Sequence, residues 1–153
     1  MCKILVDADG CPVVSVIESL AKKHGVEVLL ICDYNHDIKS DYATVIQVCQ
    51  GENRADIEIF QRCKRGDIVV TQDFGLAALV LSKGCYCLHH NGREYTDYNI
   101  DKLLFYRAMN SKRRRNSGHV KCQKKHKKGR NFARVFDAIL YKAEKAEQMA
   151  LSL

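Results

Sequence analysis

Residues 3–12 read Lys-Ile-Leu-Val-Asp-Ala-Asp-Gly-Cys-Pro, a short apolar run that ends in two acids, a glycine and a proline. The apolar residues are consecutive rather than alternating, which is typical of a strand buried on both faces. Pro12 suits the first turn of a helix, and apolar residues recur at helical spacing after it until Gly25. This stretch therefore predicts a strand followed directly by a helix, the repeating unit of a parallel α/β sheet.

The same alternation of apolar runs and helical patterns continues along the chain. Gly51, Gly66 and Gly84 separate the segments, as is usual where strands and helices end. Further strands are expected at 26–32, 44–49, 68–71 and 85–88, and helices after Asn53, at 76–81 and after Thr96. We therefore predict a three-layer α/β fold with a mainly parallel sheet of five strands and additional C-terminal helices.

Length and composition restrict the class of protein. A chain of 153 residues predicts one domain, 1–153, because a second independent core needs more chain. Apolar residues make up 46%, which excludes a fully disordered protein, and no apolar run approaches the roughly 20 residues that cross a bilayer. The N-terminus meets an acid after three apolar residues, unlike a signal peptide, and the eight cysteines then indicate reduced thiols. We expect a cytoplasmic protein with no membrane partner.

Positive charge is concentrated near the end of the chain. Residues 1–110 carry 12 Lys and Arg against 15 Asp and Glu, whereas residues 111–153 carry 13 against 3. A basic, almost acid-free segment favours a polyanionic partner, and we expect nucleic acid, RNA rather than DNA, bound through its phosphates. The residues expected to make these contacts are Arg113, Arg114, Arg115, Lys124, Lys125, Lys127, Lys128 and Arg130.

The last residues have the apolar stripe of a docked helix. Phe132, Val135, Phe136, Ile139, Leu140 and Ala143 follow the spacing i, i+3, i+4, i+7, i+8, i+11. We therefore predict a core at 1–110, a basic loop at 111–131 that is tethered at both ends, and a docking helix at 132–151.

Four acids are expected to meet at one edge of the sheet. Asp7 and Asp9 follow the first strand and Asp73 follows the fourth, and parallel strands bring their carboxyl ends to the same edge. Asp56 lies three residues before Ile59, so it belongs to the inward stripe of its helix. Clustered carboxylates repel unless a cation neutralises them, and such hard oxygen ligands suit one or two Mg²⁺ or Mn²⁺ ions.

Each acid alone also has a structural interpretation. Asp73 precedes a helix and suits its N-cap, and Asp56 in the first turn stabilises the helix dipole. Asp33, after the second strand, has the surroundings of an ordinary turn. Only the conjunction of Asp7 and Asp9 with Asp56 and Asp73 predicts a site.

Four motifs follow one another in order between residues 3 and 110. They are Val-Asp-Ala-Asp-Gly-Cys-Pro-Val (6–13), Arg-Ala-Asp-Ile-Glu-Ile (54–59), Gly-Asp-Ile-Val-Val-Thr-Gln-Asp-Phe-Gly-Leu-Ala (66–77) and Asn-Gly-Arg-Glu-Tyr-Thr-Asp-Tyr-Asn-Ile (91–100). Together they resemble the motifs of the YaiI/YqxD family of uncharacterised bacterial proteins. The resemblance implies a PIN-like nuclease fold with strand order 3-2-1-4-5. It further implies that Asp7, Asp56 and Asp73 bind the metal, with Thr71 supporting and Asp9 as a further ligand. We expect Thr71 to orient Asp73 by donating a hydrogen bond to it.

Two classes of function follow. The first is a Mg²⁺- or Mn²⁺-dependent nuclease that hydrolyses phosphodiesters, most naturally in RNA, with the basic segment recruiting the substrate. The second is a nucleic-acid-binding module of the same fold without catalysis. Acids that share one accessible cleft favour the nuclease, whereas a Lys or Arg bound into the acid cluster favours the binding module.

Three further chemistries have weaker support. Asp7-Ala8-Asp9-Gly10 resembles the opening motif of haloacid-dehalogenase-type phosphatases, but Cys11-Pro12 replaces the Thr-Leu expected there. Cys85, Cys87 and His89 share a strand face, and Cys122 and His126 lie in the basic segment, yet no Cys-x2-Cys zinc motif occurs. Cys11 near a helix N-terminus has the position of a thiolate nucleophile, without a recognisable His partner.

Overall fold

One six-stranded sheet organises the computed structural model, which describes residues 1–33, 37–116 and 130–152. The strands are β1 (Lys3–Asp7), β2 (Glu27–Asp33), β3 (Thr44–Val48), β4 (Ile68–Val70), β5 (Tyr86–Leu88) and β6 (Glu94–Tyr95). Their order is β3-β2-β1-β4-β5-β6, and all neighbours are parallel except β5 and β6. The predicted fold class and the order 3-2-1-4-5 are confirmed, and β6 is an addition to them.

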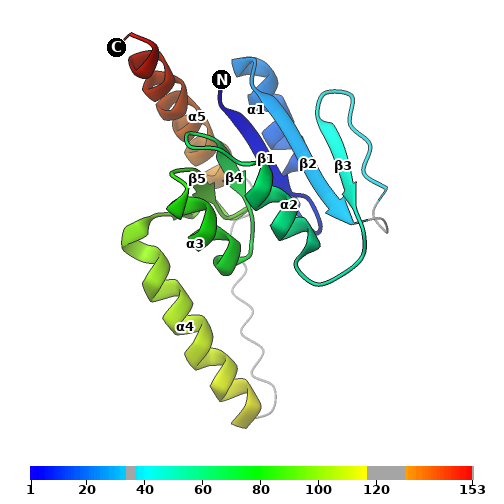
Figure 1. The fold of residues 1–153 in the computed structure, drawn as a ribbon, viewed down its shortest axis with the longest axis vertical. Coiled ribbons are helices and arrows are strands. Elements are labelled where there is room, and N and C mark those ends of the chain that lie inside the picture. The colour runs from blue at the N-terminus through cyan, green and yellow to red at the C-terminus, as the bar shows by residue number, and fades with distance from the viewer. Residues whose placement is uncertain (34–36, 117–129, 153) are drawn as a thin grey trace.

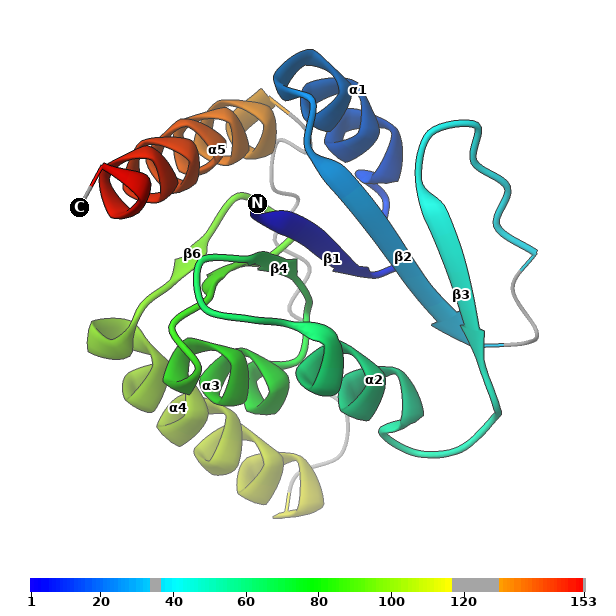
Figure 2. The same ribbon diagram turned by 45° about the horizontal axis from the view of Figure 1, so that its top comes forward.

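Helices cover both faces of this sheet. They are α1 (Val14–His24), α2 (Arg54–Arg62), α3 (Phe74–Ser82), α4 (Asp97–Asn116) and α5 (Arg130–Leu151). Figures 1 and 2 show α1 and α5 on one face and α2, α3 and α4 on the other, which makes the three layers. Within the described ranges, no helix combines the length and the apolar character that crossing a membrane requires.

Strand β1 lies at the centre and contributes to the core on both faces. Ile4 packs with Ile17 of α1 and Phe136 of α5, while Leu5 packs with Ile59 of α2 on the opposite face. All of these side chains are fully buried. Burial on both faces explains why the apolar residues of the strand are consecutive rather than alternating.

The chain changes direction across the sheet between β1 and β4. From β1 it proceeds outward through β2 to β3, and then returns to place β4 on the other side of β1, with Val6 opposite Val70. This is a topological switch point, where ligands bind in open α/β sheets. Asp7 and Thr71 are the residues at the carboxyl ends of these two strands, so the strand order itself brings them together.

A tight turn explains the sixth strand. Residues 89–93 reverse the chain with a hydrogen bond from the His89 N–H to the Arg93 carbonyl at 2.8 Å, and Asn91-Gly92 is a common turn pair. Gly92 has a φ of +94°, and a Cβ there would lie 3.1 Å from the backbone of Asn131 at the start of α5. The two-residue strand that follows is too short to be visible as a pattern in the sequence.

The basic segment is helical at both ends, which corrects the predicted loop at 111–131. Helix α4 continues to Asn116, and α5 already begins at Arg130. Lys and Arg are good helix formers, and positive charge in the last turn interacts favourably with the helix dipole. The first glycine after the helix start is Gly118, so nothing in the sequence stops α4 at residue 110.

Helix α5 docks through its apolar stripe and through an ionic contact with α1. Phe132 and Phe136 are fully buried and stacked, with ring centroids 5.3 Å apart. His24 Nε2 lies 2.8 Å from Asp137 Oδ1, and His24 Nδ1 lies 3.1 Å from Glu144 Oε1. Both ring nitrogens face carboxylates, first Asp137 and then Glu144, and this raises the pKa of His24.

We expect the contribution of His24 to stability to depend on pH. Because its folded-state pKa is raised, the stabilisation is complete below the unfolded-state pKa, near 6.5, and is lost as the pH rises through the folded-state value. His24→Gln should therefore lower the free energy of unfolding by about 1 kcal/mol at pH 5.5, and by less at pH 9. Urea unfolding at several pH values measures the difference. Lys23→Gln, which removes one exposed charge from the same helix, should show no such trend, and a pH-independent loss for His24→Gln contradicts the assignment.

Candidate active site

Three acids and a threonine meet at the carboxyl ends of β1 and β4. Asp7 is the last residue of β1, Asp56 lies in the first turn of α2, and Asp73 precedes α3. Thr71 Oγ1 donates to Asp7 Oδ2 at 3.3 Å and accepts a hydrogen bond from the Asp73 N–H at 3.0 Å. This pair of contacts connects the end of β1 to the start of α3 through the Thr71 hydroxyl. Thr71 itself is buried.

Asp73 has the structural role that its position predicts. Its Oδ1 accepts hydrogen bonds from the N–H groups of Gly75 at 2.7 Å and Leu76 at 3.2 Å, so it is the N-cap of α3. The expectation that Thr71 donates to the Asp73 carboxylate is wrong, because that carboxylate turns toward the helix N–H groups. The Thr71 hydroxyl proton goes to Asp7 instead.

The acids perturb one another electrostatically. Burial and then the charge of Asp56 raise the pKa of Asp7 to about 6, although the hydrogen bond from Thr71 acts in the opposite direction. The pKa of Asp56 is raised by burial, by the charge of Asp73 and by a hydrogen bond between these two carboxyl groups. The neighbouring charges therefore disfavour the full ionisation of Asp7 and Asp56, and a bound cation would relieve this repulsion.

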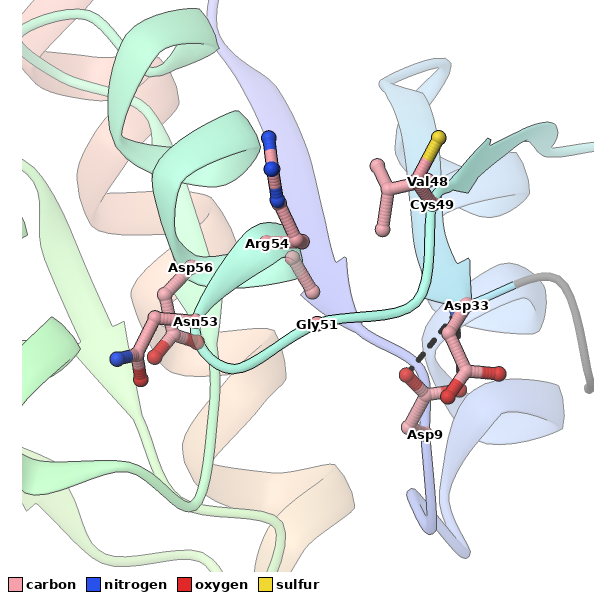
Figure 3. A pocket seen from close by; sticks show the side chains of 9 residues that line it. Asp9, Asp33, Val48, Cys49, Gly51, Asn53, Arg54 and Asp56 are labelled. Carbon is pink, nitrogen blue, oxygen red and sulfur yellow. Dashed lines mark hydrogen bonds between the residues drawn. The ribbon is translucent and has the colours of Figure 1, made fainter.

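Asp9 and Asp56 line an open cavity of about 180 Å³ beside this cluster. The Asp33 backbone N–H donates to Asp9 Oδ2 at 3.1 Å, and Figure 3 shows the two carboxylates on one side of the cavity, with Asp56 and Asn53 on the other. The remaining lining residues are Val48, Cys49, Gly51, Arg54 and Ala55. Asp33, interpreted from the sequence as an ordinary turn residue, is therefore part of the cavity wall.

The fit of a divalent cation depends on which acids it would use. In the part of the chain that the structure describes, no three His, Cys, Asp or Glu side chains are already arranged around one ion position. The charge of Asp73 acts on Asp56, however, and Mg²⁺ characteristically uses one or two carboxylates and keeps several waters. The donor set therefore fits one hard cation that these two carboxylates and water would hold.

Arg107 of α4 is a residue of this site that the sequence analysis missed. Its Nη1 lies 3.7 Å from Asp73 Oδ1, and its guanidinium lies over the Phe74 ring at 5.8 Å from the centroid. Both contacts come from the inward face of α4, which also carries Leu103 and Leu104. The spacing of four and three residues from these leucines is the signal in the sequence that Arg107 faces the body.

The predicted nucleic-acid contacts are only partly within the described residues. Arg113, Arg114 and Arg115 belong to the last turns of α4, and Arg130 is the first residue of α5. Lys124, Lys125, Lys127 and Lys128 lie outside the described residues, as do Cys122 and His126.

The core cysteines and Cys11 lie in environments unlike those of reactive thiols. Cys63, Cys85 and Cys87 are buried together in the core beneath α2 and α3, and burial raises the pKa of Cys85 to about 12. Burial also raises the pKa of Cys11, opposite to the lowering that a nucleophile at a helix N-terminus needs. Burial lowers the pKa of His89 to about 4, so this side chain is neutral at physiological pH.

Comparisons with known proteins agree with the motifs of the sequence. The sequence model of the uncharacterized YaiI/YqxD family matches residues 5–142. A UPF0178 protein of Alkaliphilus oremlandii is 45% identical over 126 residues, covering 82% of this chain and 81% of that protein. A UPF0178 protein of Natranaerobius thermophilus is 44% identical over 140 residues, covering 90% and 95% of the two chains.

One solved structure is also similar. It is a crystal structure of a mutant Rae1 (YacP) from Bacillus subtilis, 12% identical, with a TM-score of 0.43 over 95% of this chain and 99% of that one. The family match covers most of the chain and runs through the strands and helices that carry Asp7, Asp56 and Asp73. On this ground the chain belongs to the YaiI/YqxD family.

Proposed function

We propose that the protein is a Mg²⁺- or Mn²⁺-dependent phosphodiester hydrolase that acts on RNA. The observation that supports this most directly is the meeting of Asp7, Asp56 and Asp73 at the switch point of the sheet, where the neighbouring acids raise the pKa of Asp7 and of Asp56. Such an arrangement is costly for the fold, because partly buried carboxylates that repel one another lower stability. A divalent cation removes that cost, and strongly perturbed acids of this kind cluster at functional sites.

Each side chain of the site has its own role in this proposal. Asp56 and Asp73 would hold the cation, and Asp7 and Asp9 would have to move to join them, because the described residues place no three ligands around one position and Asp9 is bound to the Asp33 N–H. Thr71 holds the Asp7 carboxylate in position through its hydroxyl. A bound divalent cation activates a water molecule and neutralises the charge that develops on the departing oxygen, which is the chemistry that phosphodiester hydrolysis needs. The acidic edge of the sheet repels a polyanion such as RNA. The basic segment would offset this repulsion by binding the phosphates of the substrate.

A second candidate, the binding module without catalysis, is favoured by one observation. Arg107 lies against Asp73, and a cation bound into the acid cluster supplies part of the neutralisation that a metal ion would otherwise supply. The contact is long at 3.7 Å, and it uses Oδ1, the same oxygen that caps α3. This leaves the second oxygen of Asp73 outside both interactions, so the arginine would oppose a metal ion by its charge without occupying that ligand atom.

Titration of Mn²⁺ into the protein, with the heat of binding measured, tests the proposal. We expect wild type to bind, Asp56→Asn to lose most of the binding heat, and Arg107→Gln to bind Mn²⁺ about threefold more tightly because its competing charge, worth up to about 1 kcal/mol, is gone. The same samples are assayed for cleavage of labelled RNA. Asp41→Asn, an exposed acid between β2 and β3, is the matched control. If wild type neither binds Mn²⁺ nor cleaves RNA, the binding module replaces the nuclease.

We further expect the basic end of α4 to bind phosphates without sequence preference. Replacing Arg113, Arg114 and Arg115 by Gln removes up to three phosphate contacts, so the slope of log affinity against log salt should fall by about two for a single strand. Fluorescence anisotropy with labelled RNA at several KCl concentrations measures this slope. The control replaces three lysines elsewhere, Lys22, Lys23 and Lys145, and should leave the slope nearly unchanged. Equal slopes for the two triple variants contradict the assignment.

A further inference from the structure

Helix α4 carries apolar side chains on two opposite faces, and among the described residues one of these faces packs against α3 and the core. Ile100, Leu103 and Leu104 face the core that α4 forms with α3. Phe105 and Tyr106 point away from it and are 63% and 53% exposed. A surface helix docks through its inward stripe, so packing on the core does not explain the outward rings.

The outward residues form one continuous stripe. Lys102, Phe105, Tyr106, Met109 and Lys112 follow the spacing i, i+3, i+4, i+7 and i+10, which places them on one side of a helix. The two rings are edge to face with centroids 6.3 Å apart, and Lys102 Nζ lies 5.9 Å from the centre of the Tyr106 ring. We call these five residues the α4 outer stripe.

The charge around the stripe indicates what kind of partner covers it. No acid occurs between Asp101 and Asp137, and the helix runs directly into Arg113–Arg115. Rings that alternate with cations are the arrangement by which proteins bind single-stranded nucleic acid, because bases stack on the rings while phosphates contact the cations. Figure 1 shows the C-terminal half of α4 reaching away from the sheet.

We propose that the α4 outer stripe is a base-stacking platform for single-stranded nucleic acid. The proposal rests on the nucleic-acid binding in the proposed function and specifies its substrate class, since bases held inside a duplex present no face to these rings. On the inward side of the same helix, Arg107 contacts Asp73, so a strand bound along α4 lies one helix away from the acid cluster.

Two other occupants fit the stripe less well. A second copy of the chain would bring its own row of Lys and Arg against this one, and like charges in contact are destabilising. An anionic membrane would match the charge, but attachment strength scales with buried apolar area, and Phe105, Tyr106 and Met109 offer little.

The test compares ring variants on three ligands by fluorescence anisotropy: a 12-nucleotide oligouridylate, an RNA duplex of equal length, and an abasic strand with the same phosphates. Wild type should prefer the oligouridylate to the duplex. The double variant Phe105→Leu, Tyr106→Leu should bind the oligouridylate about tenfold or more weakly, with unchanged affinity for the abasic strand. Tyr141→Leu is the matched control, because Tyr141 is an exposed ring under Lys145 on α5, 56% exposed, and it should behave as wild type.

Several outcomes overturn the platform. The first is wild-type affinity of the double variant for the oligouridylate, and the second is an equal loss of its affinity for the abasic strand. The third is a difference in oligomeric state between wild type and the double variant in sedimentation. The fourth is a ring-dependent affinity for anionic vesicles that exceeds the affinity for RNA. Mn²⁺-dependent cleavage at saturating RNA tests the proposed hydrolase activity independently of the platform. Ring-dependent binding without cleavage supports the platform and refutes the hydrolase, whereas cleavage with ring-independent binding supports the hydrolase and refutes the platform.

Discussion

Asp7→Asn is expected to reduce Mn²⁺-dependent RNA cleavage by more than about 100-fold. Mutating a residue that only hydrogen-bonds to a metal ligand typically costs about 10- to 100-fold in activity, and loss of the ligand itself should cost more. The same substitution is expected to make the metal-free protein more stable. Asparagine keeps an acceptor oxygen for Thr71 but carries no charge, so it preserves the hydrogen bond and removes the repulsion from Asp56. A variant that is inactive yet more stable than wild type cannot owe its inactivity to misfolding.

The stability effect has a defined pH dependence. The pKa of Asp7 is raised from 3.8 to about 6, so between these values the folded state holds a proton that the unfolded state has lost. The free energy of unfolding of wild type therefore falls as the pH rises through this window, by about 2 kcal/mol after allowance for the partial exposure of the side chain. Asp7→Asn lacks this loss, so it should be about 2 kcal/mol more stable at pH 7 and nearly equal to wild type near pH 4.

Urea unfolding at pH 4 and pH 7, with and without Mn²⁺, measures both effects. Mn²⁺ should stabilise wild type by mass action and stabilise Asp7→Asn less, because the variant lacks one ligand. The control is again Asp41→Asn, which should follow wild type in every condition. Full cleavage activity in Asp7→Asn contradicts the site, and a variant that is less stable than wild type at pH 7 contradicts the electrostatic account.

The second large effect is expected in the core between α5 and the sheet. Phe136 is fully buried and stacked on Phe132, among residues of β1 and α1. Phe136→Ala should lower the free energy of unfolding by about 3–5 kcal/mol, because the lost apolar contacts leave a cavity that the stacked neighbour cannot fill. Denaturant unfolding followed by circular dichroism measures the loss.

The matched control for this prediction is Tyr141→Ala on the exposed side of α5, with an expected effect within about 0.5 kcal/mol. A loss below about 1 kcal/mol for Phe136→Ala would mean that α5 unfolds separately from the sheet. In that case the docking helix would be an appendage of the domain and not a part of its cooperative core.

The sequence alone determines those features that depend on one element at a time. Consecutive apolar residues identified β1 and its burial on both faces, and the spacing to Ile59 identified Asp56 as an inward acid. The helical stripe that begins at Phe132 predicted the docking of α5. These properties follow from the periods of helices and strands, which are local and can be counted along the chain.

Contacts between distant elements were decided only by the tertiary structure. The donation from Thr71 to Asp7, the approach of Arg107 to Asp73, and the place of Asp33 in the cavity wall each join segments that no local period relates. The extension of α4 into the basic segment has a different reason. A run of cations is compatible with either a solvated loop or a helix, and the choice depends on the neighbouring turns and on the absence of a helix-stopping residue. The spacing of apolar residues along the chain therefore predicts which side chains face inward. The packing of helices against the sheet decides which of these side chains contact one another.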